Sequence, residues 1–164
     1  MSEDGFEFKV EGNLELERAF SNLKYKLQRK IGIKALRKGA NVIKKAAQNN
    51  VRSTSQTIAD SLTVVTGKGL NVFVTPKKKK LKNGIVDAFF AQWVELGTKP
   101  HKIKNTKKGK KKVLAGNGKF FGSEINHPGT KAKPYLRPAL DENAKPAVSA
   151  TKKEMFRLME KSLK

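Results

Sequence analysis

The longest regular pattern in the sequence is helical and runs from Leu16 to Ala47. Apolar residues recur there every three or four positions, at Leu16, Phe20, Leu23 and Leu27 and then at Ile33, Leu36, Ala40, Ile43 and Ala47. This spacing gives one apolar stripe and predicts one long helix or two, with Asn13 as the N-cap. Gly32 and Gly39 predict a bend near the middle, because glycine weakens a helix. The outer face of the second series is basic and is expected to meet either solvent or DNA; it consists of Lys34, Arg37, Lys38, Lys44 and Lys45.

Alternating side chains predict strands in two other places. Residues 5–11 alternate apolar and charged side chains, which indicates a short N-terminal strand. In residues 61–76, "SLTVVTGKGLNVFVTP", β-branched residues flank a Gly-Lys-Gly turn. That pattern predicts a β-hairpin, which Pro76 ends.

Residues 85–98, "IVDAFFAQWVELGT", are compatible with either a strand or a short helix that ends at Gly97. Both interpretations bury the large side chains of Phe89, Trp93 and Val94. The sequence does not decide between them.

The C-terminal part has a second helical pattern, within which Pro146 is expected to limit or kink the helix. Its apolar positions are Leu136, Leu140, Ala144, Val148, Met155, Leu158 and Met159. The predicted fold is a single α+β domain, residues 1–164, since the length suits one domain. In it a small antiparallel sheet packs against a long N-terminal helix, or two helices, and a C-terminal helix.

The charge is strongly positive and uneven. The chain has 36 Lys and Arg against 14 Asp and Glu, a net charge of +22, which favours contact with polyanions such as nucleic acid or an anionic membrane surface. Residues 1–12 form an acidic N-terminal strand or arm. This acidic edge suits head-to-tail contact between identical subunits, although a partly disordered N-terminus is the simpler interpretation.

Residues 99–112 contain eight lysines and no acid, so they cannot be core and are expected to be extended and mobile. The following "VLAGNGKFF" places apolar pairs on either side of Gly-Asn-Gly and predicts a small hairpin tip. Together they predict that residues 99–126 form a projecting basic arm, an extended loop or hairpin.

The sequence contains no recognisable catalytic or metal-binding motif, so we expect no enzymatic activity, no cofactor and no metal site. The chain has no cysteine, and its two histidines, His101 and His127, lack the spacing of metal ligands. No nucleophile elbow, Walker loop or HExxH occurs. A nuclease would need carboxylates such as Asp87 and Glu95 to converge. No secretory signal and no run of 18 apolar residues is present, so synthesis inside the cell and no membrane contact are expected.

Two segments, "FFAQWVELGTK" (89–99) and "HPGTKAKPYLRPALDE" (127–142), resemble the tail-completion, or neck (head–tail joining), proteins of long-tailed double-stranded DNA bacteriophages, the gene-product-ten-like and minor-tail-protein-Z-like family. "SQTIADSL" (55–62) is similar to a third family segment, with Ser55 and Gln56 in place of Thr-Gly. The motif residues are Trp93, Val94, Glu95, Gly97, Thr98, His127, Pro128, Gly129, Thr130, Pro134, Tyr135, Leu136, Arg137 and Pro138.

The resemblance implies a structural subunit without catalysis. It implies a homo-oligomeric ring of six in the virion neck, assembled in the host cytoplasm, that joins the head connector to the tail tube and contacts tail-terminator and head-completion proteins. Double-stranded DNA would pass through its channel without sequence-specific contact. Candidate contacts to DNA or acidic partners are Lys77, Lys78, Lys79, Lys80, Lys107, Lys108, Lys110, Lys111 and Lys112.

Three details of the motifs carry expectations of their own. Tyr135 and Leu136 are expected to anchor the chain in the core, and Pro138 suits the first turn of the last helix. Glu95 is expected to bond to the backbone or to Arg137, or else to face solvent. The alternative function is a sequence-independent nucleic-acid-binding protein of ribosomal or chromatin-like type, which would bind as a monomer with steep salt dependence.

Overall fold

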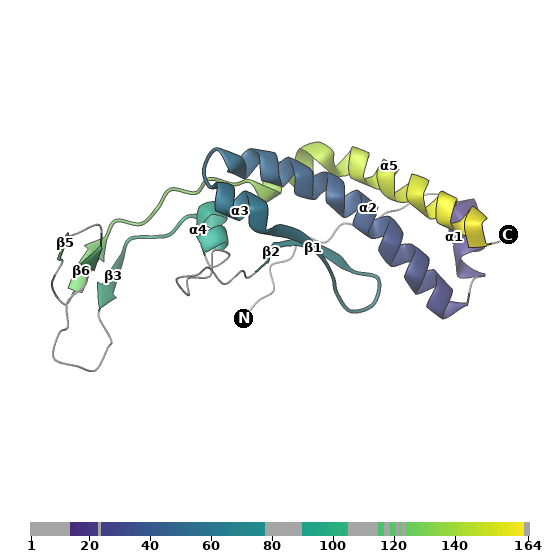
Figure 1. Ribbon diagram of the computed structural model, residues 1–164, viewed down its shortest axis with the longest axis horizontal. Helices are drawn as coiled ribbons and strands as arrows, with labels where there is room; N and C mark the ends of the chain where they lie inside the picture. The colour runs from purple at the N-terminus through teal and green to yellow at the C-terminus, as the bar shows by residue number, and fades with distance from the viewer. Residues whose placement is uncertain are drawn as a thin grey trace. The chain divides into compact units, whose positions relative to one another are not determined.

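The computed structural model describes residues 14–22, 24–77, 90–104, 115–116, 119–120, 122 and 124–162 (Figure 1). The chain divides into two compact units. Unit 1 comprises Met1–Phe89 and Tyr135–Lys164, and unit 2 comprises Phe90–Pro134. The predicted N-terminal strand and the predicted N-cap Asn13 lie outside the described residues.

The fold is α+β and mostly helical, as predicted. Unit 1 contains α1 (Leu14–Ser21), α2 (Tyr25–Arg52), α3 (Gln56–Ser61), β1 (Leu62–Thr66), β2 (Val72–Pro76) and α5 (Leu136–Ser162). Unit 2 contains α4 (Ala91–Leu96), β3 (His101–Lys104), β4 (Ala115–Gly116), β5 (Lys119–Phe120) and β6 (Glu124–His127). The strands form three antiparallel pairs: β1 with β2, β3 with β6, and β4 with β5.

The N-terminal helical pattern is divided between two helices, one of the two predicted alternatives. The division lies between Ser21 and Tyr25, and α2 then continues through Gly32 and Gly39 to Arg52. Both glycines are buried and serve close packing instead. A Cβ atom at Gly39 would overlap the Thr151 hydroxyl and lie 2.6 Å from the Ala147 carbonyl oxygen.

The core of unit 1 lies between α2 and α5, which run side by side (Figure 1). Small side chains make the contact, because Gly39 lets the two backbones approach closely. Gly39 lies against Ala147 and Thr151 of α5. The small residues that are buried in the two helices are Ala35, Ala40 and Ala47 of α2 and Ala139, Ala147 and Thr151 of α5. A second cluster joins Ile31 and Met159, against which Phe20, Leu27, Met155 and Leu158 pack.

The C-terminal helix is confirmed, but its buried face is the predicted one only in part. Met159 is buried, with Met155 and Leu158 packed beside it, as the pattern predicts. Nearer the start of α5, Leu136, Leu140 and Val148 are only half-buried, and Ala144 is exposed. Alanine and threonine at the neighbouring positions are buried instead. Pro146 is exposed inside α5 and does not end the helix.

The predicted hairpin is confirmed. β1 pairs with β2 in register from Leu62 opposite Pro76 to Thr66 opposite Val72. Leu62 and Val64 are buried on one face, whereas Val65 and Phe73 are exposed on the other.

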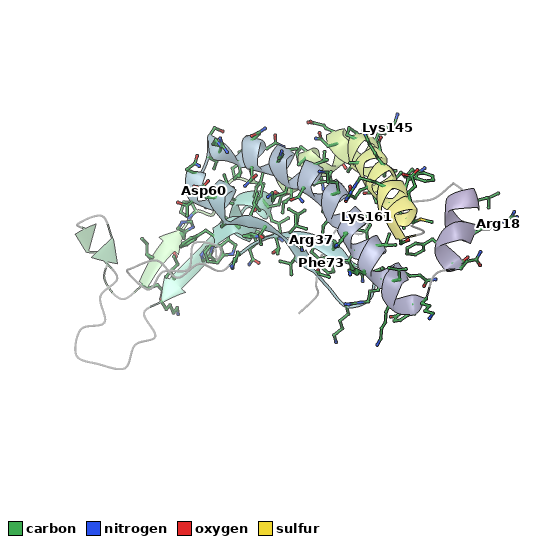
Figure 2. The ribbon with its side chains drawn as sticks, turned by 45° about the vertical axis from the view of Figure 1, so that its right-hand side comes forward. Arg18, Arg37, Asp60, Phe73, Lys145 and Lys161 are labelled. Carbon is green, nitrogen blue, oxygen red and sulfur yellow. The ribbon has the colours of Figure 1, made fainter. Side chains whose placement is uncertain are left out.

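Side-chain hydrogen bonds fix the segments around this hairpin. Arg37 of α2 donates from Nη1 to the Val64 carbonyl oxygen at 3.1 Å, and Figure 2 labels this side chain together with Phe73 of β2. Ser55 caps α3 by accepting a hydrogen bond from the Ile58 amide at 3.3 Å. The segment "SQTIADSL" therefore begins with a helix cap that serine, like threonine, can provide.

The segment that enters α5 is anchored as predicted by Tyr135, which is 1% exposed. The Asn50 side-chain amide donates to the Tyr135 carbonyl oxygen at 3.3 Å. Leu136, the second predicted anchor, is half-buried. Pro138 lies in the first turn of α5, where a helix needs no backbone N–H from it.

In unit 2 the ambiguous segment is a helix, α4, which ends at Gly97. Trp93 and Val94 are half-buried rather than buried, and Phe89 lies outside the described residues. The predicted hairpin tip is present, since Ala115 pairs with Phe120 and Gly116 with Lys119.

Candidate functional site

The two motif segments of unit 2 meet through their Gly-Thr dipeptides, residues 97–98 and 129–130, which we call the Gly-Thr clasp. The Thr98 amide donates to the Thr130 carbonyl oxygen at 2.9 Å, and the Thr130 amide donates to the Thr98 carbonyl oxygen at 3.0 Å. The Lys133 amide also donates to the Val94 carbonyl oxygen, at 2.8 Å. Residues about thirty positions apart in the sequence thus form one backbone structure.

Glycine is needed at both clasp positions for two independent reasons. Gly97 and Gly129 have φ angles of 70° and 87°, in the left-handed region that other residues rarely adopt. A Cβ atom at Gly97 would lie 2.6 Å from the Thr130 carbonyl oxygen, and one at Gly129 would overlap the Thr98 carbonyl oxygen. Each glycine therefore makes room for the backbone of the opposite segment.

The two histidines face each other across the first residue pair of the β3–β6 ladder. Their ring centroids are 5.0 Å apart. His127 Nδ1 accepts a hydrogen bond from the Gly129 amide at 3.0 Å, so that nitrogen carries no proton. His101 Nδ1 lies 2.8 Å from the Lys99 carbonyl oxygen and donates its proton to it. Each ring thus stabilises the turn next to it.

The ladder itself carries charges of both signs. Glu124 of β6 lies 3.3 Å from Lys102 Nζ and 3.3 Å from Lys104 Nζ of β3. All three side chains are substantially exposed, so these ion pairs contribute little to stability. The sequence prediction considered only repulsion among the lysines of residues 99–112 and missed this acid on the returning strand.

Helix α4 combines exposed apolar side chains with a buried acid. Leu96 is 73% exposed and Phe90 is 45% exposed, and the Phe90 ring meets the Trp93 ring edge to face at 5.6 Å. Glu95 is only 9% exposed, which excludes the interpretation that it simply faces solvent.

Among the described elements of unit 1, α2 carries the most basic residues, on a surface that we call the α2 basic face. The helix has nine basic residues and no acidic residue, whereas α5 has six basic and four acidic residues. The α2 basic face consists of Lys26, Arg29, Lys30, Lys34, Arg37, Lys38, Lys44, Lys45 and Arg52. All are exposed except Lys44, which is half-buried.

Five of these nine residues were predicted to lie on an outer helix face that meets either solvent or DNA, but they were not among the candidate contact residues. The signal was nevertheless present, because residues 25–52 contain no acid. Of the lysines that were selected, Lys77 is exposed directly after β2. Lys78 to Lys80 and Lys107 to Lys112 lie outside the described residues.

The remaining motif residues lie mostly at the surface. Pro128, Thr130, Pro134 and Arg137 are exposed, whereas Pro138 is half-buried. Among the described residues, no group of three or more His, Asp and Glu side chains is placed to hold a metal ion. None of the described helices is long and apolar enough to cross a membrane.

Residues 15–97 match the HK97-gp10-like protein family, whose description is "Bacteriophage HK97-gp10, putative tail-component". The match covers just over half of the chain, from α1 to the end of α4. It includes the first motif as far as Gly97, and the segment from His127 to Ala139 lies beyond it. A search of curated proteins and a search of solved structures each found no match.

Proposed function

The chain belongs to the HK97-gp10-like family of bacteriophage tail components, and from this premise we propose that it is a tail-completion subunit of the phage neck. Family membership gives it a structural role in the virion tail. Our proposal is more specific: copies of the chain form a ring, with six as the expected number, between the head connector and the tail tube, around the DNA channel. Tail-terminator and head-completion proteins are the neighbours we propose.

The observation that carries the proposal is the family match over residues 15–97, because it includes the core helix α2, the hairpin and α4. Two surface features are consistent with a place in an assembly. Leu96 and Phe90 expose apolar area on α4, which suits contact with another protein. The net charge of +22 suits a position next to DNA.

The alternative, a sequence-independent nucleic-acid-binding protein, is favoured by one observation, the acid-free α2 basic face. It predicts tight, salt-dependent binding of nucleic acid by the isolated monomer and no incorporation into virions. The neck proposal predicts incorporation whether or not the monomer binds DNA.

The proposal is tested by quantitative mass spectrometry of purified virions and by electron microscopy of particles from a phage that lacks the gene. We expect several copies per virion, and we expect separate full heads and tails when the gene is missing. A plasmid copy of the gene should restore joined particles. Absence of the protein from purified virions, or normal joined particles without the gene, would overturn the neck proposal.

A further inference from the structure

The basic residues of α2 gather on one side of the helix. With about 100° between successive residues, its nine basic side chains fall within roughly 180° of the helix circumference. Five of the eight buried residues of α2, among them Ala35, Gly39 and Ile43, lie outside this arc, whereas Ala40, Ala47 and Val51 lie along one margin of it. Folding therefore leaves eight of the nine basic side chains exposed at the surface of unit 1, although β1 and α3 contact the same side of α2 through Arg37 and Gln48.

These charges are not neutralised within the part of the chain that the structure describes. There, none of the nine side chains forms an ion pair. Glu154 of α5 is close enough for Lys38 and Lys34 to help lower its pKa, but the hydrogen bond from Arg157 is the larger cause. Arg37 is partly engaged, since it donates to Val64 and Thr66 of β1.

The excess positive charge cannot be neutralised within one copy of the chain, so we expect a partner outside the chain to neutralise it. All fourteen acids are already included in the net charge of +22, so no rearrangement within one copy can remove it. A second copy carries the same excess and repels the first. A ring of identical subunits would increase this repulsion further, and a polyanion bound to each subunit would relieve it.

The arrangement of the charges favours the phosphate backbone of a duplex. Lys26, Lys30, Lys34 and Lys38 repeat every four residues, about 6 Å apart along a helix that is about 42 Å long. Double-stranded DNA presents a negative charge about every 1.7 Å of its axis. Lysines reach phosphates as point charges and read no base sequence. A membrane surface fits less well, because the apolar side of α2 is already packed on α5.

We propose that the α2 basic face binds the phosphate backbone of double-stranded DNA without sequence preference. The place of that DNA, inside the neck channel, rests on the proposed function, but the binding is a property of the isolated protein. This assigns DNA contact to a folded surface of unit 1, in addition to the lysine tracts at 77–80 and 107–112.

The test compares two variants of the full chain that lose equal charge. The first is Lys26→Gln, Lys30→Gln, Lys34→Gln and Lys45→Gln on α2, and the control is Lys145→Gln, Lys152→Gln, Lys153→Gln and Lys161→Gln on α5. Fluorescence anisotropy with a labelled 30-base-pair duplex of random sequence would give the affinity from 50 to 400 mM KCl. Circular dichroism would show that both variants keep the helix content of the unmodified chain.

We expect the α2 variant to bind roughly 100-fold more weakly at 150 mM KCl and to lose about three to four units from the slope of log K against log [KCl]. The α5 control should lose less than one unit. A third variant with arginine at the same four α2 positions should retain binding.

Equal losses in the two glutamine variants would show that net charge alone governs binding and would overturn the proposal. Unchanged DNA binding by the α2 variant would overturn it as well. If that variant then failed to enter virions, the face would be assigned to an acidic protein surface instead. DNA binding that depends on α2, by a protein absent from virions, would support this inference while overturning the neck proposal.

Discussion

Units 1 and 2 both depend on glycine, but for different physical reasons. In unit 1, Gly39 has ordinary helical geometry and lets α5 approach α2 until small side chains fill the space between them. In unit 2, Gly97 and Gly129 have positive φ angles and allow two backbone segments to form hydrogen bonds with each other. Side-chain packing therefore holds the described core of unit 1, and backbone pairing holds the clasp of unit 2.

The strongest test of this difference is Gly39→Ala. Alanine favours a helix over glycine by about 1 kcal/mol. However, its Cβ atom would overlap the Thr151 hydroxyl and lie 2.6 Å from a backbone oxygen that cannot rotate away. We expect the collision to dominate and the free energy of unfolding to fall by about 2–3 kcal/mol, measured by urea denaturation followed by circular dichroism. An unchanged or higher stability would show that α2 and α5 are not in close contact at Gly39.

The clasp is tested by Gly97→Ala, with Gly122→Ala as its matched control. Gly122 has a similar φ of 78° but no atom near the position of a Cβ, so the control isolates the backbone cost of about 1 kcal/mol. At Gly97 the contacts with Thr130 and Ala132 add to that cost. We expect hydrogen exchange at the Thr98 and Thr130 amides to accelerate about tenfold or more in Gly97→Ala. Equal exchange in both variants would mean that the clasp tolerates a Cβ atom.

The same contrast shows how far the sequence predicts the structure. The hairpin at β1 and β2 follows from local residue preferences, and so does the existence of α5. The buried face in the first part of α5 does not, because periodicity selects large residues such as Leu140, whereas Gly39 makes Ala147 and Thr151 the contact residues. Local sequence patterns also do not predict that Thr98 pairs with Thr130, although both segments were recognised as motifs.

The sequence likewise predicts only some of the candidate contact surfaces. Lysine tracts at 77–80 and 107–112 are conspicuous in the sequence because their charges are adjacent. On α2 the charges are separated by apolar residues and become one surface only when the helix forms. The distribution of acids, rather than the count of bases, is the sequence signal that distinguishes α2 from α5.

Two threonines give a finer test. The Thr151 hydroxyl is buried in unit 1 and donates to the Ala147 carbonyl oxygen at 2.9 Å. Among the described residues, Thr98 Oγ1 in unit 2 is buried without a hydrogen-bond partner. We therefore expect Thr151→Val to lower the free energy of unfolding by about 1 kcal/mol.

For Thr98→Val we expect no loss, or a gain of up to about 1 kcal/mol, because an unpaired buried hydroxyl is removed. Hydrogen exchange at the Thr130 amide measures this locally. Faster exchange in Thr98→Val would show that the Thr98 hydroxyl has a hydrogen-bond partner. The clasp would then depend on a side-chain hydrogen bond, as the Thr151 contact in unit 1 does.

The smallest effect concerns charge on the surface of α5. Arg157 donates to both carboxylate oxygens of Glu154, at 2.9 and 2.6 Å, and this hydrogen bonding lowers the pKa of Glu154 below its usual value of 4.5. A lowered folded-state pKa stabilises the protein above the unfolded-state pKa, and the contribution is lost as the pH falls through the folded-state value. We expect Glu154→Gln to lower the melting temperature slightly at pH 7 and not at pH 2. The control Glu160→Gln removes an exposed carboxylate that has no ion pair among the described residues. Because the Arg157 side chain is 58% exposed and that of Glu154 is 19% exposed, 1 M KCl should reduce the difference between the two variants. A difference unchanged by salt would mean that Glu154 acts by packing rather than by charge.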